Sequence, residues 1–172
     1  MTLLIISFLV IAAYTAAVCV KQKGVPYSIS ATFYKLQHPY WFMAAMWATA
    51  GLLMPAALET GKPGTEFLAF LACAGMLFVG AAPNFREELE GKVHMSGAVV
   101  CVVASQLWVA FNGWWVLIPV WSAYLIYTCI AIGKQKEGVF VYKFIQTKPM
   151  FWCEIAALFT TFGVCGLAFR LL

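Results

Sequence analysis

The sequence predicts an all-α membrane protein, a bundle of about six transmembrane helices with both termini on the non-cytoplasmic side. Hydrophobic residues make up 63% of the 172-residue chain and charged residues only 10%, whereas a soluble domain carries about 25% charged residues. The apolar residues also gather into long runs. Because a small soluble domain leaves much of its surface exposed, lipid must be the solvent for many of these residues.

Each predicted helix is an apolar run long enough to cross a bilayer, which takes ~20 residues. Residues 1–172 form one domain, with helices at about 2–20, 40–58, 65–83, 94–111, 114–132 and 150–171. No basic residue precedes the first run, which favours a retained helix over a secretory signal.

Proline and glycine punctuate these runs. Pro39 and Pro149 stand at the starts of the second and sixth helices, where proline is tolerated. Pro119 lies inside the fifth range and predicts a kink there. Only Asn112 and Gly113 separate the fourth and fifth helices, which predicts a tight hairpin between them.

The basic residues predict the orientation. Nine of the eleven lie in three alternate loops, namely Lys21, Lys23, Lys35, Arg86, Lys92, Lys134, Lys136, Lys143 and Lys148. The other two, Lys62 and Arg170, lie on the opposite side. Basic loops stay in the cytoplasm, so the nine residues predict cytoplasmic loops and a location in a cell membrane, as in a bacterial inner membrane.

Several classes of function lack support in the sequence. The basic residues are scattered among apolar runs, so we expect no binding of nucleic acid. The six cysteines each fall inside an apolar run and form no CxxC, which is typical of small apolar packing residues. With two histidines, no Asp and none of the usual catalytic motifs, we expect no cofactor, no metal and, on balance, no enzyme.

Glu154 is the strongest candidate functional residue, because a carboxylate inside a membrane segment is costly and by default marks function. It lies near the cytoplasmic start of the sixth helix. One interpretation is a carboxylate that handles protons or cations, or anchors helices. The alternative is that it serves the start of its own helix or pairs with Lys148.

Four further residues complete the candidate polar site on the cytoplasmic side: His94, His38, Tyr27 and Ser30. The loop 24–38 contains Tyr27 and Ser30 and is rich in hydroxyl groups. It either packs back against the bundle as a lid or lies on the lipid headgroups. Four polar residues near the middle of helices are expected to hydrogen-bond across helices, namely Ser105, Gln106, Thr160 and Thr161.

Two cytoplasmic loops share a pattern. Residues 21–39 contain KQKGV, then Tyr-Lys, and end in Pro before aromatic residues; residues 133–149 contain KQKEGV, then Tyr-Lys, and also end in Pro before aromatic residues. Either the chain holds an internal helix–loop–helix repeat, as parallel repeats do in transporters, or two loops of one side have converged on similar basic and aromatic chemistry.

Residues 24–98, with PYSISATFY upstream of FREELEGKVHMSGA, look like a group of small bacterial multi-pass membrane proteins without assigned function. They also resemble the Frag/Sfk type of membrane protein at Pro26, Tyr27, Ser30, Pro83, His94 and Ala98. The acidic residue that this pattern has after the serine is Ala31 here. The resemblance implies a bundle of five or six helices in a bacterial inner membrane.

The sequence favours a small transporter or channel-like protein. The lipid bilayer is its expected partner, and a second copy of the chain or another membrane protein is a candidate partner. The first alternative is a membrane scaffold without catalytic activity. The second is an intramembrane enzyme that acts on a lipid through Glu154, His94 and hydroxyl groups.

Overall fold

A computed structural model describes residues 1–35, 40–85, 87–135 and 137–171. Over these residues the chain is helical, without strands. Six long α-helices fall on the six predicted runs: α1 (Thr2–Lys21), α2 (Tyr40–Thr60), α3 (Glu66–Ala81), α4 (Glu87–Gly113), α5 (Leu117–Gly133) and α7 (Pro149–Leu171). Shorter helical pieces are η1 (Ser30–Lys35), η2 (Ala82–Asn84), η3 (Trp114–Val116) and α6 (Phe140–Gln146). The prediction of an all-α fold is confirmed over the described residues.

Five segments are long and apolar enough to cross a membrane: Thr2–Lys21, Tyr40–Thr60, Glu66–Asn84, Leu89–Gly133 and Pro149–Arg170. The fourth of these has 45 residues and contains most of α4 and all of α5. About 20 residues suffice for one crossing. This segment is therefore long enough for two crossings.

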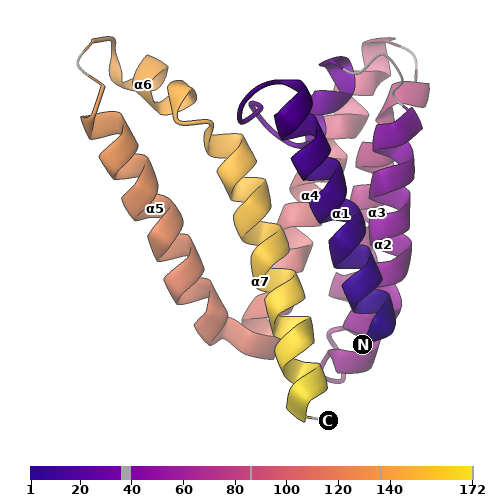
Figure 1. The fold of residues 1–172 in the computed structure, drawn as a ribbon. Coiled ribbons are helices and arrows are strands. Elements are labelled where there is room, and N and C mark those ends of the chain that lie inside the picture. Colours follow the sequence, from indigo (N-terminus) through magenta and orange to yellow (C-terminus); the bar gives the residue numbers. More distant parts are fainter. Residues whose placement is uncertain (36–39, 86, 136, 172) are drawn as a thin grey trace.

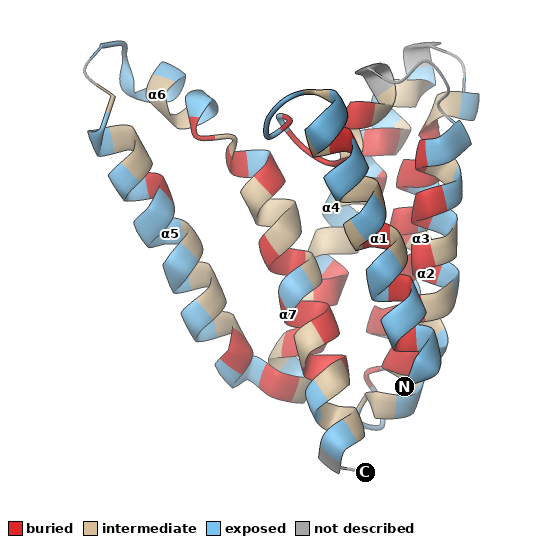
Figure 2. Ribbon diagram, viewed as in Figure 1, coloured by how far each residue is buried: buried red, intermediate tan, exposed pale blue. Residues whose placement is uncertain are grey.

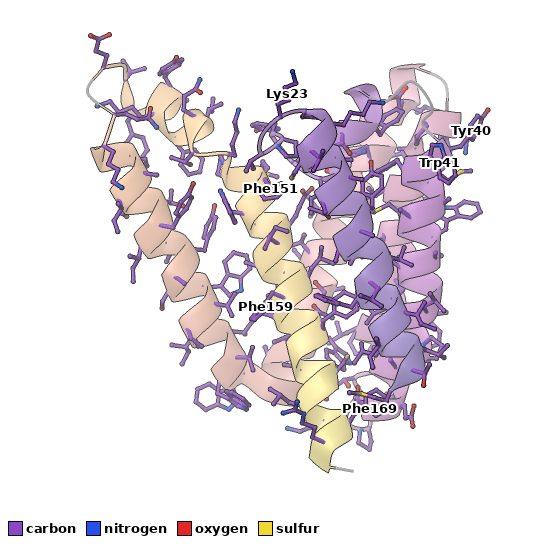
Figure 3. All side chains as sticks on the ribbon, viewed as in Figure 1. Lys23, Tyr40, Trp41, Phe151, Phe159 and Phe169 are labelled. Atoms are coloured by element: carbon purple, nitrogen blue, oxygen red, sulfur yellow. The ribbon has the colours of Figure 1, made fainter. Side chains whose placement is uncertain are left out.

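The long helices run alternately up and down between two ends of the molecule (Figure 1). Both termini lie at one end, called here the terminal end. The other end, called here the basic end, holds the connections from α1 to α2, from α3 to α4 and from α5 to α7. Figure 3 places Lys23 and Tyr40 at the basic end and Phe169 at the terminal end.

Five helices form the bundle and the sixth diverges from it. α3 packs between α2 and α4, α1 packs on α2, and α7 packs against α4. α5 leaves the terminal end at an angle and packs mainly against α7 (Figure 1). Accordingly, Thr128 is its one buried residue, and Figure 2 shows α5 mostly in the colours of exposed and intermediate residues. The short turn predicted at Asn112–Gly113 lies between α4 and α5, with η3 added, but the two helices diverge from it and α5 packs mainly against α7.

The kink predicted at Pro119 needs correction. The fifth helix begins only at Leu117, after the 3-10 turn η3. Pro119 therefore lies in the first turn, where its missing N–H would be unpaired anyway and no kink is required. The second helix, with Pro55 inside it, ends at Thr60, two residues beyond the predicted boundary.

The closest helix contact joins α3 and α4 at their glycines. A Cβ on Gly75 would lie 2.6 Å from the backbone nitrogen of Cys101 and 2.7 Å from the carbonyl oxygen of Gly97. A Cβ on Gly97 would lie 3.0 Å from the carbonyl oxygen of Gly75. Small residues at such crossings let two backbones approach closely, and the resulting van der Waals contact stabilises helix pairs in lipid.

Hydrogen bonds connect the helices at other levels. The buried Ser7 hydroxyl of α1 donates to the Thr49 carbonyl of α2 at 2.8 Å. At the terminal end, Asn112 accepts from the Lys62 backbone at 2.6 Å and donates to Thr65 and to the Trp108 carbonyl. The connection from α2 to α3 is thus held against the end of α4.

We predict that Gly75→Ala destabilises the protein by about 1–3 kcal/mol, the usual cost of overpacking a tight contact. The obstructing atoms belong to the backbone of α4 and cannot rotate away. Thermal unfolding in detergent micelles measures the effect. Gly51→Ala is the matched control, since a Cβ there meets nothing within 4 Å and alanine favours a helix by about 0.5–1 kcal/mol over glycine. Equal unfolding midpoints for the two variants would contradict the prediction.

Candidate functional site

The carboxylate of Glu154 is held by backbone and side-chain donors from the loop between α1 and α2. The Ser30 hydroxyl donates to Oε1 at 2.6 Å, and the Ser30 N–H donates to the same oxygen at 3.4 Å. The Ile29 N–H donates to Oε2 at 2.5 Å. Hydrogen bonds to a charged acceptor are stronger than neutral ones. Glu154 therefore joins α7 to a segment more than a hundred residues earlier in the chain.

Residues 27–32, called here the cap segment, fold inward instead of lying outside the bundle. Ser28, Ile29 and Thr32 are buried. The Ser28 hydroxyl accepts from the Ala31 N–H at 2.9 Å, which pairs one of the free N–H groups at the start of the short helix η1. Of the two sequence interpretations of loop 24–38, the cap segment has the one that packs against the helices; residues 36–38 lie outside the described residues.

The cap segment is attached to α1 and α7 at several points. The Thr32 hydroxyl donates to the Ile29 carbonyl at 2.6 Å, so the Tyr14 hydroxyl of α1 donates to Thr32, also at 2.6 Å. The Phe151 N–H at the start of α7 donates to the Tyr27 carbonyl at 3.0 Å. This bond satisfies one of the N–H groups that the first turn of a helix leaves without a partner.

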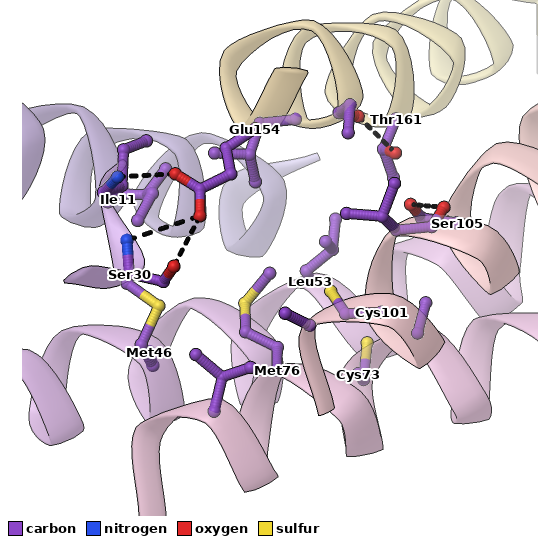
Figure 4. Close-up of a pocket in the computed structure, with 17 residues that line it drawn as sticks. Ile11, Ser30, Met46, Leu53, Cys73, Met76, Cys101, Ser105, Glu154 and Thr161 are labelled. Carbon is purple, nitrogen blue, oxygen red and sulfur yellow. Dashed lines mark hydrogen bonds between the residues drawn. The ribbon is translucent and has the colours of Figure 1, made fainter. Parts of the chain in front are cut away.

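Glu154 and the cap segment line one end of a cavity of about 90 Å³ that is partly open to the surface (Figure 4). Side chains from α1, α2, α3, α4 and α7 form the rest of the wall, including Ile11, Met46, Leu53, Met76, Cys101 and Leu158. The wall is almost entirely apolar. Apart from Glu154, its polar side chains are the hydroxyls of Ser30, Ser105 and Thr161 and the thiols of Cys73 and Cys101.

The other candidate residues are only partly brought together. Ser30 meets Glu154, whereas Tyr27 contributes its carbonyl to α7 and leaves its side chain 43% exposed. His94 is buried on α4 but is not among the residues that line this cavity. His38 lies outside the described residues.

The alternative of a Glu154–Lys148 ion pair is not seen among the described residues, since both are described and Glu154 is bonded to Ile29 and Ser30 instead. Nor do three His, Cys, Asp or Glu side chains gather as a metal site within the part of the chain that the structure describes. Among the described residues, the hydrogen-bond partners of Glu154 are thus all neutral donors.

Gln106 connects three helices beside the cavity. Its side-chain oxygen accepts from Thr160 of α7 and from the Trp121 indole of α5, both at 3.0 Å, and its amide donates to the Ala157 carbonyl at 3.3 Å. Ser105 and Thr161 instead donate to carbonyls of their own helices. Of the four residues expected to bond across helices, Gln106 and Thr160 do so. Trp121 is an additional partner that its position in an apolar run did not indicate.

Comparison with protein-family models, curated proteins and solved structures gave no match. The similarity to the Frag/Sfk type of membrane protein therefore stays a prediction from the residues alone.

We predict that Gln106→Leu destabilises the protein by about 2 kcal/mol, because three interhelical bonds of ~0.6 kcal/mol each are lost. A double-mutant cycle with Trp121→Phe, measured by thermal unfolding in detergent, should show that the two losses are not additive. Thr128→Val is the control, since that hydroxyl bonds only within α5 at 2.8 Å. A Gln106→Leu variant as stable as this control would argue against the role of Gln106.

Proposed function

We propose that the protein is a small multi-pass transporter or channel-like protein of a bacterial inner membrane, in which Glu154 handles a cation or a proton. The observation that carries the proposal is a carboxylate on the wall of an otherwise apolar cavity among five helices. A binding site for a small permeant species has this form, a mainly apolar pocket with a few placed polar groups.

The charge of Glu154 supports a cationic occupant. An ionised carboxylate in an apolar environment is costly unless it is paired. Its donors, the Ile29 N–H and the N–H and hydroxyl of Ser30, are all neutral. A positive charge that enters the cavity, or a proton taken up by the carboxylate, would supply the missing compensation.

The cap segment supports a gating role. It lies between the basic end and the cavity, and Ile29 and Ser30 are part of the cavity wall. Apart from the burial of Ile29 in the core, its attachments are individual hydrogen bonds to Tyr14, Phe151 and Glu154 and not a helix–helix contact. Release of the Glu154 bonds would free the segment to move and would open the cavity toward the basic end.

We further propose six membrane crossings with both termini outside. The alternation of the long helices between the two ends supports this topology (Figure 1). Nine of the eleven Lys and Arg residues belong to the connections at the basic end or to the ends of the helices that they join, and this end would face the cytoplasm.

A second candidate, a membrane scaffold, draws on the surface of α5. This helix exposes large apolar side chains along its length, including Ile118, Leu125, Ile126 and Ile130, each at least 53% exposed. In a membrane this surface would contact lipid, a second copy or another membrane protein. A lipid-acting enzyme has less support, because His94 and Glu154 do not share the cavity.

We predict that Glu154→Gln abolishes cation flux while the fold is kept, because the amide keeps the shape but removes the charge. Proteoliposomes are tested for flux of H⁺, K⁺, methylammonium and Ag⁺ under an imposed potential. Glu59→Gln is the matched control, since Glu59 is exposed near the terminal end. Ser30→Ala should raise flux through the loosened cap segment.

Equal flux in the wild type and Glu154→Gln would remove Glu154 from any transport mechanism. Absence of flux for all four cations in the wild type, together with a stable co-purifying membrane protein, would favour the scaffold.

The topology makes a separate prediction about access to the two ends. In intact cells, a membrane-impermeant maleimide should label Lys62→Cys, whereas Lys23→Cys should be labelled only after permeabilisation. The unmodified chain, with its six native cysteines, provides the background. Labelling of Lys23→Cys in intact cells, without labelling of Lys62→Cys, would reverse the orientation.

A further inference from the structure

Four sulfur-containing side chains line the cavity. Met46 comes from α2, Cys73 and Met76 come from α3, and Cys101 comes from α4. Figure 4 shows them along the wall that faces α7, with Met46 at the Ser30 end and the two cysteines at the other. Cys73, Met46 and Met76 are buried, so these sulfur atoms face the interior and not lipid.

The two cysteines lie on the two helices that cross closely. Cys73 is on α3, two residues before Gly75, and Cys101 is on α4, where its backbone nitrogen faces Gly75. Both cysteines line the same cavity, and neither is in a disulfide.

We infer that the cavity binds a soft monovalent metal ion, Cu(I), through the sulfur atoms of Cys73, Cys101 and Met76. Thiolate and thioether ligands select Cu(I) over harder ions. Met46 would be the sulfur that the ion meets first from the side of the cap segment. The proposed site has only two cysteines, and its third ligand is the thioether of Met76. It is therefore not one of the groups of three His, Cys, Asp or Glu side chains that are absent from the described residues.

Hard cations fit the cavity wall poorly. Ca²⁺ takes six to eight oxygen ligands and Mg²⁺ needs a near-octahedral set. The side-chain oxygens on the wall belong only to Glu154, Ser30, Ser105 and Thr161, which together offer fewer oxygens than Ca²⁺ takes. The four sulfur atoms on the wall are thus a better ligand set for a soft metal ion than its oxygen atoms are for a hard one.

Glu154 would balance the charge when the ion binds. Formation of a Cu–S bond to one of the two cysteines releases the proton of that thiol, since the thiolate is the ligand, while the other cysteine keeps its proton and coordinates as a neutral thiol. Glu154 is the carboxylate on the same cavity and would accept this proton. The cavity then holds a neutral Cu(I) thiolate and a neutral carboxylic acid, and copper stays Cu(I) throughout.

The test measures metal binding by the purified full-length protein in detergent under anaerobic conditions. Cu(I) is supplied in competition with a chromogenic Cu(I) chelator, and Ag⁺ serves as a redox-inert second probe. We expect one ion per chain. Met76→Leu, which removes the sulfur but keeps the volume, should weaken binding at least about tenfold, the lower end of what a supporting residue contributes at metal sites. Cys101→Ala should weaken it further.

The controls are a thiol and a thioether away from the cavity, Cys129→Ala on α5 and Met95→Leu on α4, both exposed. Thermal unfolding without metal establishes that each variant is folded. No binding by the wild type would overturn the inference, and so would binding that Cys129→Ala reduces as much as Cys101→Ala. The Met76→Leu result stands even where Cys101→Ala does not fold.

This inference rests on the proposed cation-handling function for its role in transport, but the binding test is independent of flux. Flux of methylammonium or protons without binding of Cu(I) or Ag⁺ would be consistent with the proposed function and would contradict the inferred metal site. Stoichiometric binding of Cu(I) without flux of any cation would support the metal site and contradict the proposed transport function.

Discussion

The hydrogen bonds between Glu154 and the cap segment are the contact on which the arrangement of the basic end depends. The carboxylate accepts from Ile29 and Ser30. Inside a bundle of low dielectric, each partner would be costly without the other, because an unpaired carboxylate and unpaired backbone N–H groups both lose their hydration there. One side chain on α7 thereby holds a loop that follows α1, and it holds that loop inside the bundle.

This contact also couples helices that hardly touch one another. The cap segment bonds to Tyr14 of α1, to the Phe151 N–H of α7 and to Glu154, so a movement of α7 displaces the loop as well. On the far side of α7, Gln106 and Trp121 connect the same helix to α4 and α5. α7 is consequently the element through which a change of charge in the cavity would reach the rest of the molecule.

The local features could be read from the sequence, and the long-range partners could not. Apolar runs of sufficient length predicted the six long helices, and the cost of an intramembrane carboxylate singled out Glu154. Hydroxyl-rich loop composition indicated Ser30 without indicating its partner. The course of α5 could not be predicted, because a turn signal at Asn112–Gly113 indicates where a helix ends and not what the next helix packs against. Cys73 and Cys101 were interpreted as packing residues, since each lies in an apolar run and only the bundle brings them to one cavity with Met46 and Met76.

The two similar loops differ in burial. Each follows a long helix and contains a short one; in the sequence Pro39 comes just before α2, and Pro149 is the first residue of α7, and aromatic residues follow both prolines. The first loop is buried at Ile29 and Thr32, whereas α6 of the second has no buried residue. Counted from the two prolines, Glu154 of α7 corresponds to Ala44 of α2. α2 therefore has no carboxylate at the level where α7 binds the first loop. The second loop thus has no carboxylate that corresponds to Glu154 and could accept from its N–H groups. Its aromatic residues remain at the surface of the basic end. This difference holds whether the loops arose by duplication or by convergence.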